Sequence, residues 1–98
     1  MQDTTNGPIA PKAENMAVEF DLTVGKETFA VGIIEAKGKH VTRAQQIMGG
    51  EETRYYPALM HVVCRIGGKV MPMEYYEEMP MHAFSALMVR LNTEGFTG

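Results

Sequence analysis

The sequence predicts an α+β fold, in which an N-terminal β-hairpin packs on a bundle of about three α-helices. Residues 16–36 alternate apolar and polar side chains, whereas residues 40–92 carry apolar side chains at helical spacing in segments separated by glycine pairs. A chain of 98 residues supports a single hydrophobic core. We therefore expect one domain over residues 16–92, with a flexible leader at 1–15 and a tail at 93–98.

The hairpin is predicted from a period of two that begins at Met16. Apolar side chains at Val18, Phe20 and Leu22 fall on one face, and polar residues alternate with them. The turn at residues 24–27 contains a glycine, and the β-branched and aromatic residues from Thr28 to Glu35 form the returning strand, with Gly32 a candidate β-bulge. Because an isolated hairpin is marginally stable in water, the helices are expected to cover its apolar face.

The first helix is predicted over Val41–Met48, after a basic loop that includes Lys37 and Lys39. It should end at Gly49-Gly50, since glycine readily takes the left-handed conformation found after helix ends. The second helix is predicted over Arg54–Ile66 and is apolar around most of its circumference, which indicates the central core helix.

The remaining chain predicts one short and one longer helical segment. Met71 precedes Pro72 and should be extended, and a short helical turn is expected at Glu74–Glu78. The last helix is predicted over Met81–Leu91, because Phe84, Leu87, Met88 and Leu91 follow the i, i+3, i+4, i+7 pattern.

Composition and charge disfavour several function classes. The net charge is −3 and the nine basic residues are scattered, so a nucleic-acid partner is not expected. No stretch approaches the roughly 20 apolar residues that span a bilayer, and no signal-peptide pattern is present, so no membrane association is expected. One cysteine, Cys64, lies in an apolar run and is expected to be buried in a reducing cytoplasm.

The sequence offers little from which to build an active site. Its three histidines, His40, His61 and His82, form no HExxH pair, and no GxSxG motif is present. His61 is most simply a core-edge histidine, and the glutamates between Glu74 and Glu78 fit a solvated helix face. We therefore predict that the protein is not an enzyme and needs no cofactor.

Nine methionines allow three interpretations. Two Met-Pro-Met units, at residues 71–73 and 79–81, have a spacing that thioether ligands for Cu(I) could use. Flexible methionine side chains also line adaptable binding surfaces or fill irregular gaps in a core. Ordinary packing is the simplest interpretation, followed by a binding surface and then by copper.

The order of segments from Ile34 onward resembles the tail assembly chaperones of long-tailed bacteriophages. The likeness rests on four stretches, which are IEAKGKHVTRAQQIMGG, RYYPALMHVVCRI, GGKVMPMEYYEEM and PMHAFSALMVRLN. The resemblance implies a protein of the host cell cytoplasm that binds the tape measure protein, keeps it soluble during tail assembly and also meets tail tube subunits. It further implies self-association and no catalytic residue.

Apolar positions that are not needed to cover the hairpin are the candidates for partner binding. These are Tyr55, Met71, Met73, Tyr75, Tyr76, Met79 and Met81. Two alternative functions remain open at this point. One is a small phage regulatory or anti-defence protein that binds a host enzyme through the same surface, and the other is a methionine-rich Cu(I)-binding module.

Overall fold

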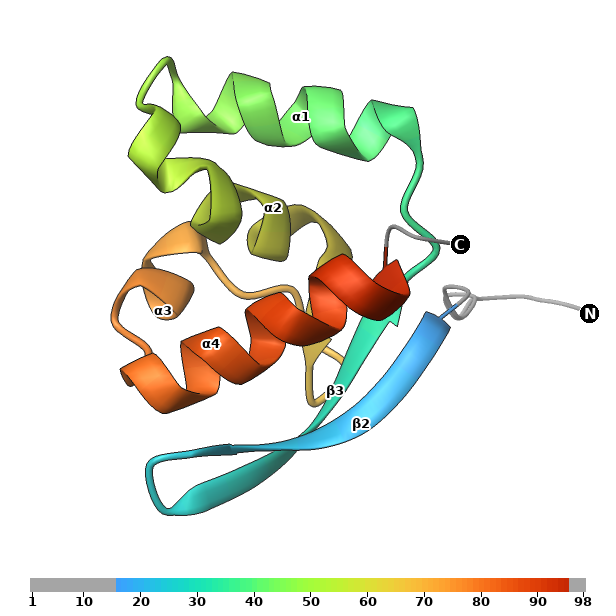
Figure 1. Ribbon diagram of the computed structural model, residues 1–98, viewed down its shortest axis with the longest axis vertical. Helices are drawn as coiled ribbons and strands as arrows, with labels where there is room; N and C mark the ends of the chain where they lie inside the picture. Colours follow the sequence, from blue (N-terminus) through green and yellow to red (C-terminus); the bar gives the residue numbers. More distant parts are fainter. Residues whose placement is uncertain (1–15, 96–98) are drawn as a thin grey trace, which may run out of the picture.

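A three-stranded antiparallel sheet and four α-helices make up the part of the chain that the computed structural model describes, residues 16–95 (Figure 1). The predicted α+β class, with a hairpin packed on helices, is confirmed. The leader predicted at residues 1–15 and the last three residues of the predicted tail lie outside this range. The elements are β2 (Met16–Val24), β3 (Glu27–Ile34), α1 (Gly38–Met48), the 3₁₀ turn η1 (Glu52–Arg54), α2 (Tyr55–Val63), β4 (Cys64–Ile66), α3 (Met73–Glu77), α4 (Met81–Arg90) and the π-helical turn η2 (Leu91–Gly95).

The hairpin forms as its period of two predicts. Val24 pairs with Glu27 across a two-residue turn, and Gly25 has a φ of +67°, the positive value that type II′ turns require at this position. The bulge predicted at Gly32 is wrong, because Gly32 pairs directly with Glu19 and the register shifts instead between Met16 and Val18. A Cβ at Gly32 would lie 2.6 Å from Sδ of Met16, so a larger residue there would require the flexible Met16 side chain to move.

The third strand corrects the predicted second helix, which was expected to continue to Ile66. Helix α2 ends at Val63, and Cys64 is extended with a ψ of 149°. Strand β4 then pairs antiparallel with β3, placing Cys64 opposite Ile33 and Ile66 opposite Val31. All four of these residues are buried. Pairing with a strand more than 30 positions earlier in the chain therefore takes these residues out of the helix.

Helix α1 begins at Gly38, three positions before its predicted start. The ring of His40 accounts for the earlier start, because its Nδ1 accepts a hydrogen bond of 2.8 Å from the backbone N–H of Lys37. This bond satisfies an amide that otherwise has no partner at a helix start. The helix ends as predicted, with Gly49 left-handed at φ +63°.

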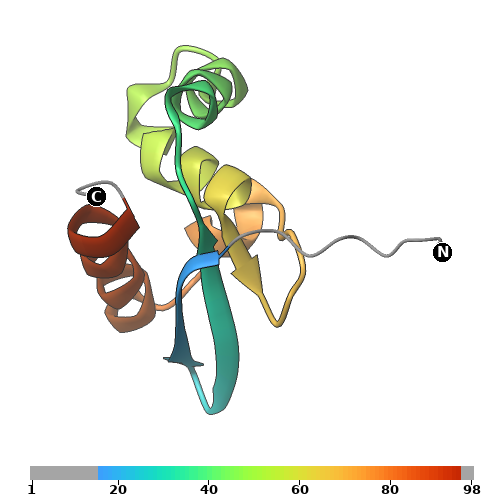
Figure 2. The same ribbon diagram turned by 90° about the vertical axis from the view of Figure 1, so that its right-hand side faces the viewer.

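The helices cover the apolar face of the sheet. Helix α4 and η2 pack against β2, and α1 packs on α2. Figure 2 shows α4 beside β2, with β4 on the far side of β3. The predicted stripe of α4 is confirmed, because Leu87 and Leu91 are fully buried. At the C-terminal end of α4, the guanidinium carbon of Arg90 lies 4.5 Å from the centre of the Phe20 ring.

Candidate functional site

The seven residues predicted to bind a partner do not form one exposed surface. Met81 is 75% exposed, whereas Tyr55, Met71 and Tyr75 are half-buried. The other three, Met73, Tyr76 and Met79, are buried and belong to the core. These three residues are spaced by three positions, which is typical of one face of a helix, and this spacing would have allowed the sequence to assign them to the core.

An open hollow lies where α2, α3 and α4 meet, and we call it the helical hollow. Its volume is about 350 Å³. It is lined by Thr53, Tyr56, Pro57, Tyr76, Glu77, Met79, Met81 and Phe84. The predicted site residues Tyr76, Met79 and Met81 meet here, and the exposed Met81 lies on its wall. A hollow of this size with mainly aromatic and thioether walls can receive apolar side chains of another molecule.

A second hollow, of about 310 Å³, is bordered by β3, the end of β4 and α3. It is lined by Phe29, Ile66, Gly67, Lys69, Met71 and Tyr75, so it contains two further predicted residues. Neighbouring side chains on a helix point about 100° apart, which is why Tyr75 faces this hollow and Tyr76 the helical hollow. The two tyrosine rings contact each other edge to face, with centroids 5.3 Å apart.

The four methionines of the two Met-Pro-Met units are divided among different places. Met71 lines the second hollow, Met73 is buried, and Met79 and Met81 line the helical hollow. Over residues 16–95, no three His, Cys, Asp or Glu side chains lie close enough together to hold a metal ion. Of the four thioethers, Met79 and Met81 line the same hollow, whereas Met71 and Met73 are not among its lining residues.

Arg54 holds α3 against the start of α2, a role that the sequence analysis does not predict. Its Nε and Nη2 donate to the two carboxylate oxygens of Glu77 at 2.7 and 2.9 Å. Glu74 and Glu51 lie at 3.6 and 3.7 Å from the same guanidinium. Because Thr53 and Glu77 both line the helical hollow, this ion pair fixes one side of it.

Glu77 should make stability depend on pH. The hydrogen bonds from Arg54 lower the pKa of Glu77 below its ordinary value of 4.5. A carboxylate with a lowered pKa in the folded state stabilises the fold above its unfolded-state pKa, and loses this effect as the pH falls through its folded-state pKa. Wild type should therefore be more stable than Glu77→Gln at pH 7, and the difference should vanish in acid.

Urea unfolding of both proteins between pH 7 and pH 2 measures this difference. The control Glu52→Gln removes the same charge from an exposed position of the neighbouring turn η1. Because Arg54 and Glu77 are close to water, added salt should reduce the effect. A difference between wild type and Glu77→Gln that stays constant across the pH range would contradict the role given to this ion pair.

Tyr56 and Phe84 also line the helical hollow, although the sequence patterns assigned Phe84 to the core stripe of its helix. Tyr56 is held by neighbours on both sides. Its ring contacts Tyr55 at 5.6 Å between centroids, and its hydroxyl donates to Oδ1 of Asn92 at 3.3 Å. Both residues are half-buried, so the hollow exposes parts of side chains that also contribute to the core.

Two buried groups near the centre of the fold are poor candidates for chemistry. Burial raises the pKa of Cys64 to about 12, so the thiolate needed for nucleophilic attack is scarcely populated at neutral pH. Burial likewise raises the pKa of Tyr76.

The Nδ1 atom of His61 lies 2.7 Å from the carbonyl oxygen of Met71, as expected for a histidine at the edge of the core.

The hydroxyl of Tyr76 is buried and has no hydrogen-bond partner within the described residues. Tyr76→Phe should therefore leave stability unchanged or raise it by about 1 kcal/mol, because no hydrogen bond is lost and a buried polar atom is removed. Thermal and urea unfolding check this result. A loss of more than about 1 kcal/mol would mean that this hydroxyl has a partner in solution.

Comparisons with known proteins return no family model, no curated protein and no solved structure that matches this chain. Within residues 16–95, none of the helices has the length and hydrophobicity needed to cross a membrane.

Proposed function

We propose that this chain is a bacteriophage tail assembly chaperone that binds the tape measure protein during tail assembly in the host cell cytoplasm. The observation that carries the proposal is the helical hollow, an open site with apolar walls on a small acidic protein. The choice of the tape measure protein as the partner comes from the resemblance of the segment order from Ile34 onward to the tail assembly chaperones. The proposal needs no catalytic residue or cofactor.

Met81 is the side chain through which we expect the partner to be held. It is 75% exposed and extends the apolar wall formed by Met79 and Phe84. Methionine side chains adapt to differently shaped apolar partners, which suits binding to a long helical protein at more than one place. An amphipathic helix laid in this hollow would place its apolar residues against these three side chains.

Self-association and binding of tail tube subunits belong to the same proposal as secondary expectations. Both follow from the resemblance, and analytical ultracentrifugation of the protein alone and with the tail tube protein tests them. A monomer at all concentrations would remove self-association without affecting binding of the tape measure protein.

Coexpression tests the main proposal. The proposal implies a partner tape measure protein, which should be more soluble when the two proteins are produced together and should co-purify with the tagged chain. The control is coexpression with an unrelated acidic protein of similar size, which should leave the yield unchanged. If the soluble yield does not rise and nothing co-purifies, the proposal is wrong.

A tagged chain that captures one defined host enzyme and no tail protein would favour the alternative regulatory or anti-defence function.

A further inference from the structure

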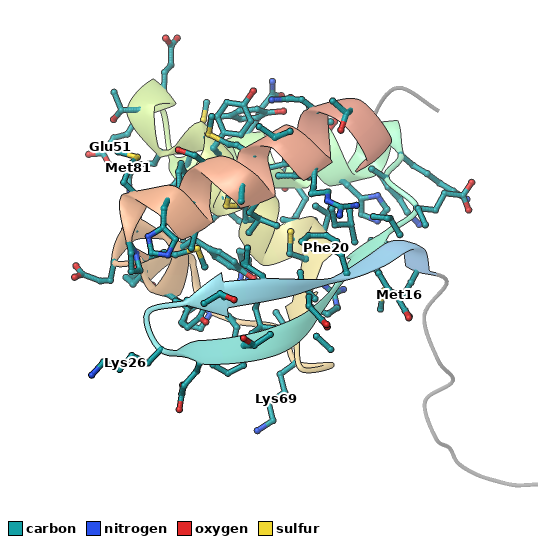
Figure 3. All side chains as sticks on the ribbon, turned by 60° about the horizontal axis from the view of Figure 1, so that its bottom comes forward. Met16, Phe20, Lys26, Glu51, Lys69 and Met81 are labelled. Carbon is teal, nitrogen blue, oxygen red and sulfur yellow. The ribbon has the colours of Figure 1, made fainter. Side chains whose placement is uncertain are left out.

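Five glutamates lie on or next to η1 and α3, two of the elements that border the helical hollow, and one of them, Glu77, lines it. Glu51 and Glu52 lie at the start of η1, and Glu74, Glu77 and Glu78 lie in or directly after α3. Figure 3 shows Glu51 and Met81 at the same end of the molecule, and Thr53 and Met81 line one hollow. These five glutamates carry five negative charges, and Arg54 carries one positive charge. Together the six residues have a net charge of −4, whereas the whole chain has a net charge of −3.

Several of these carboxylates remain available to another molecule. Arg54 pairs most closely with Glu77, so its charge is largely committed there. The side chains of Glu51 and Glu74 are 66% and 69% exposed, and each lies more than 3.5 Å from the guanidinium. Glu52 and Glu78 are also exposed, and in the sequence they stand next to Thr53 and Met79, which line the hollow.

Apolar walls and an acidic rim select the same kind of partner. From this combination we infer that the helical hollow binds an amphipathic helix whose apolar residues are flanked by lysine or arginine. The apolar side chains enter between Met79, Met81 and Phe84, and the cationic side chains meet the glutamates of η1 and α3. The inference rests on the proposed function only for the identity of the protein that supplies this helix.

The charge pattern makes other occupants less suitable. An acidic helix would bring like charges together at the rim, and a polar segment would leave the apolar walls uncovered. A second copy of this chain carries the same acidic hollow, so two copies cannot pair hollow to hollow without like-charge repulsion. The charged rim also implies binding that weakens with salt, because the glutamates are exposed to solvent.

Synthetic peptides provide the test, with the full chain as the receptor. The first probe is a helical peptide of about four turns with leucines along one face and lysines beside them. A second peptide carries glutamates in place of the lysines, and a third keeps the lysines but replaces the leucines with serines. The triple variant Glu52→Gln, Glu74→Gln, Glu78→Gln removes three rim charges and leaves Glu77 paired with Arg54.

The matched control removes three negative charges elsewhere, through Glu19→Gln, Asp21→Asn and Glu35→Gln, all of which are exposed. We expect the leucine-lysine peptide to bind wild type and the control alike, and the triple variant about tenfold more weakly. High salt should weaken the binding of the leucine-lysine peptide to wild type by a similar factor. The other two peptides should bind at least tenfold more weakly than the first.

The inference is overturned if all three peptides bind alike, if the serine-lysine peptide binds as tightly as the leucine-lysine one, or if the triple variant binds the latter as wild type does. It is also overturned if wild type forms dimers that Met81→Glu abolishes, with the peptide binding only by competing with the second copy. Tape measure protein binding that is equal for wild type and the triple variant would refute the inference but leave the proposed function standing. Charge-dependent peptide binding without binding of the tape measure protein would support the inference and refute the proposed function.

Discussion

Replacing Leu87 with alanine should lower the free energy of unfolding by about 2 to 5 kcal/mol. Leu87 is fully buried on the face of α4 that packs against the core. Truncating it removes apolar contacts and leaves a cavity that the neighbouring helices only partly fill. Urea denaturation monitored by circular dichroism, with wild type as reference, gives the change directly.

The same helix supplies the control. Val89 is 59% exposed on α4, so Val89→Ala removes little buried surface. Alanine also favours the helix more than valine does, and the change should stay within about 0.5 kcal/mol or stabilise slightly. Equal losses for Leu87→Ala and Val89→Ala would show that α4 does not pack as described.

Replacing Met81 with glutamate should weaken the proposed binding of the tape measure protein at least about tenfold, while leaving the melting temperature nearly unchanged. Met81 is 75% exposed in the free protein, so a charge there costs the fold little. A bound partner would cover the charge and bring it close to Glu77 on the same hollow. The affinity for the tightest-binding of a set of overlapping tape measure segments measures the effect.

Val89→Glu is the control for this second prediction, since it adds the same charge to an exposed apolar position of the same helix, away from the hollow. It should bind the tape measure segment within about twofold of wild type. If Met81→Glu binds like wild type, or if the two variants weaken binding equally, the partner does not use the helical hollow.

Local sequence patterns predict most of this fold, because most of its helices, strands and turns are determined by residues close together in the sequence. The hairpin follows from alternation around Phe20, and α4 follows from the spacing of Leu87 and Leu91, both of which are fully buried. Positive φ at Gly25 and Gly49 marks the turn and the helix end where the sequence places them. In each case, the residues that determine the element lie within a few positions of one another.

Strand β4 and the helical hollow depend instead on distant partners. The run from Val62 to Ile66 is equally compatible with the end of a helix, and only pairing with β3 makes its last three residues a strand. Arg54 and Glu77 are 23 positions apart, so their ion pair leaves no local signal. The sequence identified Met81 as a candidate but could not show that Tyr56 and Phe84 lie beside it.

The methionines allow the central claim to be tested directly in solution. With ¹³C-methyl-labelled methionine, each of the nine methyl groups gives an NMR signal, and binding of the tape measure segment can be followed at every one. We expect the methyl signals of Met79 and Met81 to shift or broaden, and those of Met16 and Met48, which lie outside the helical hollow, to stay in place. Shifts confined to Met16 and Met48, with Met79 and Met81 unchanged, would contradict the claim that this hollow receives the partner.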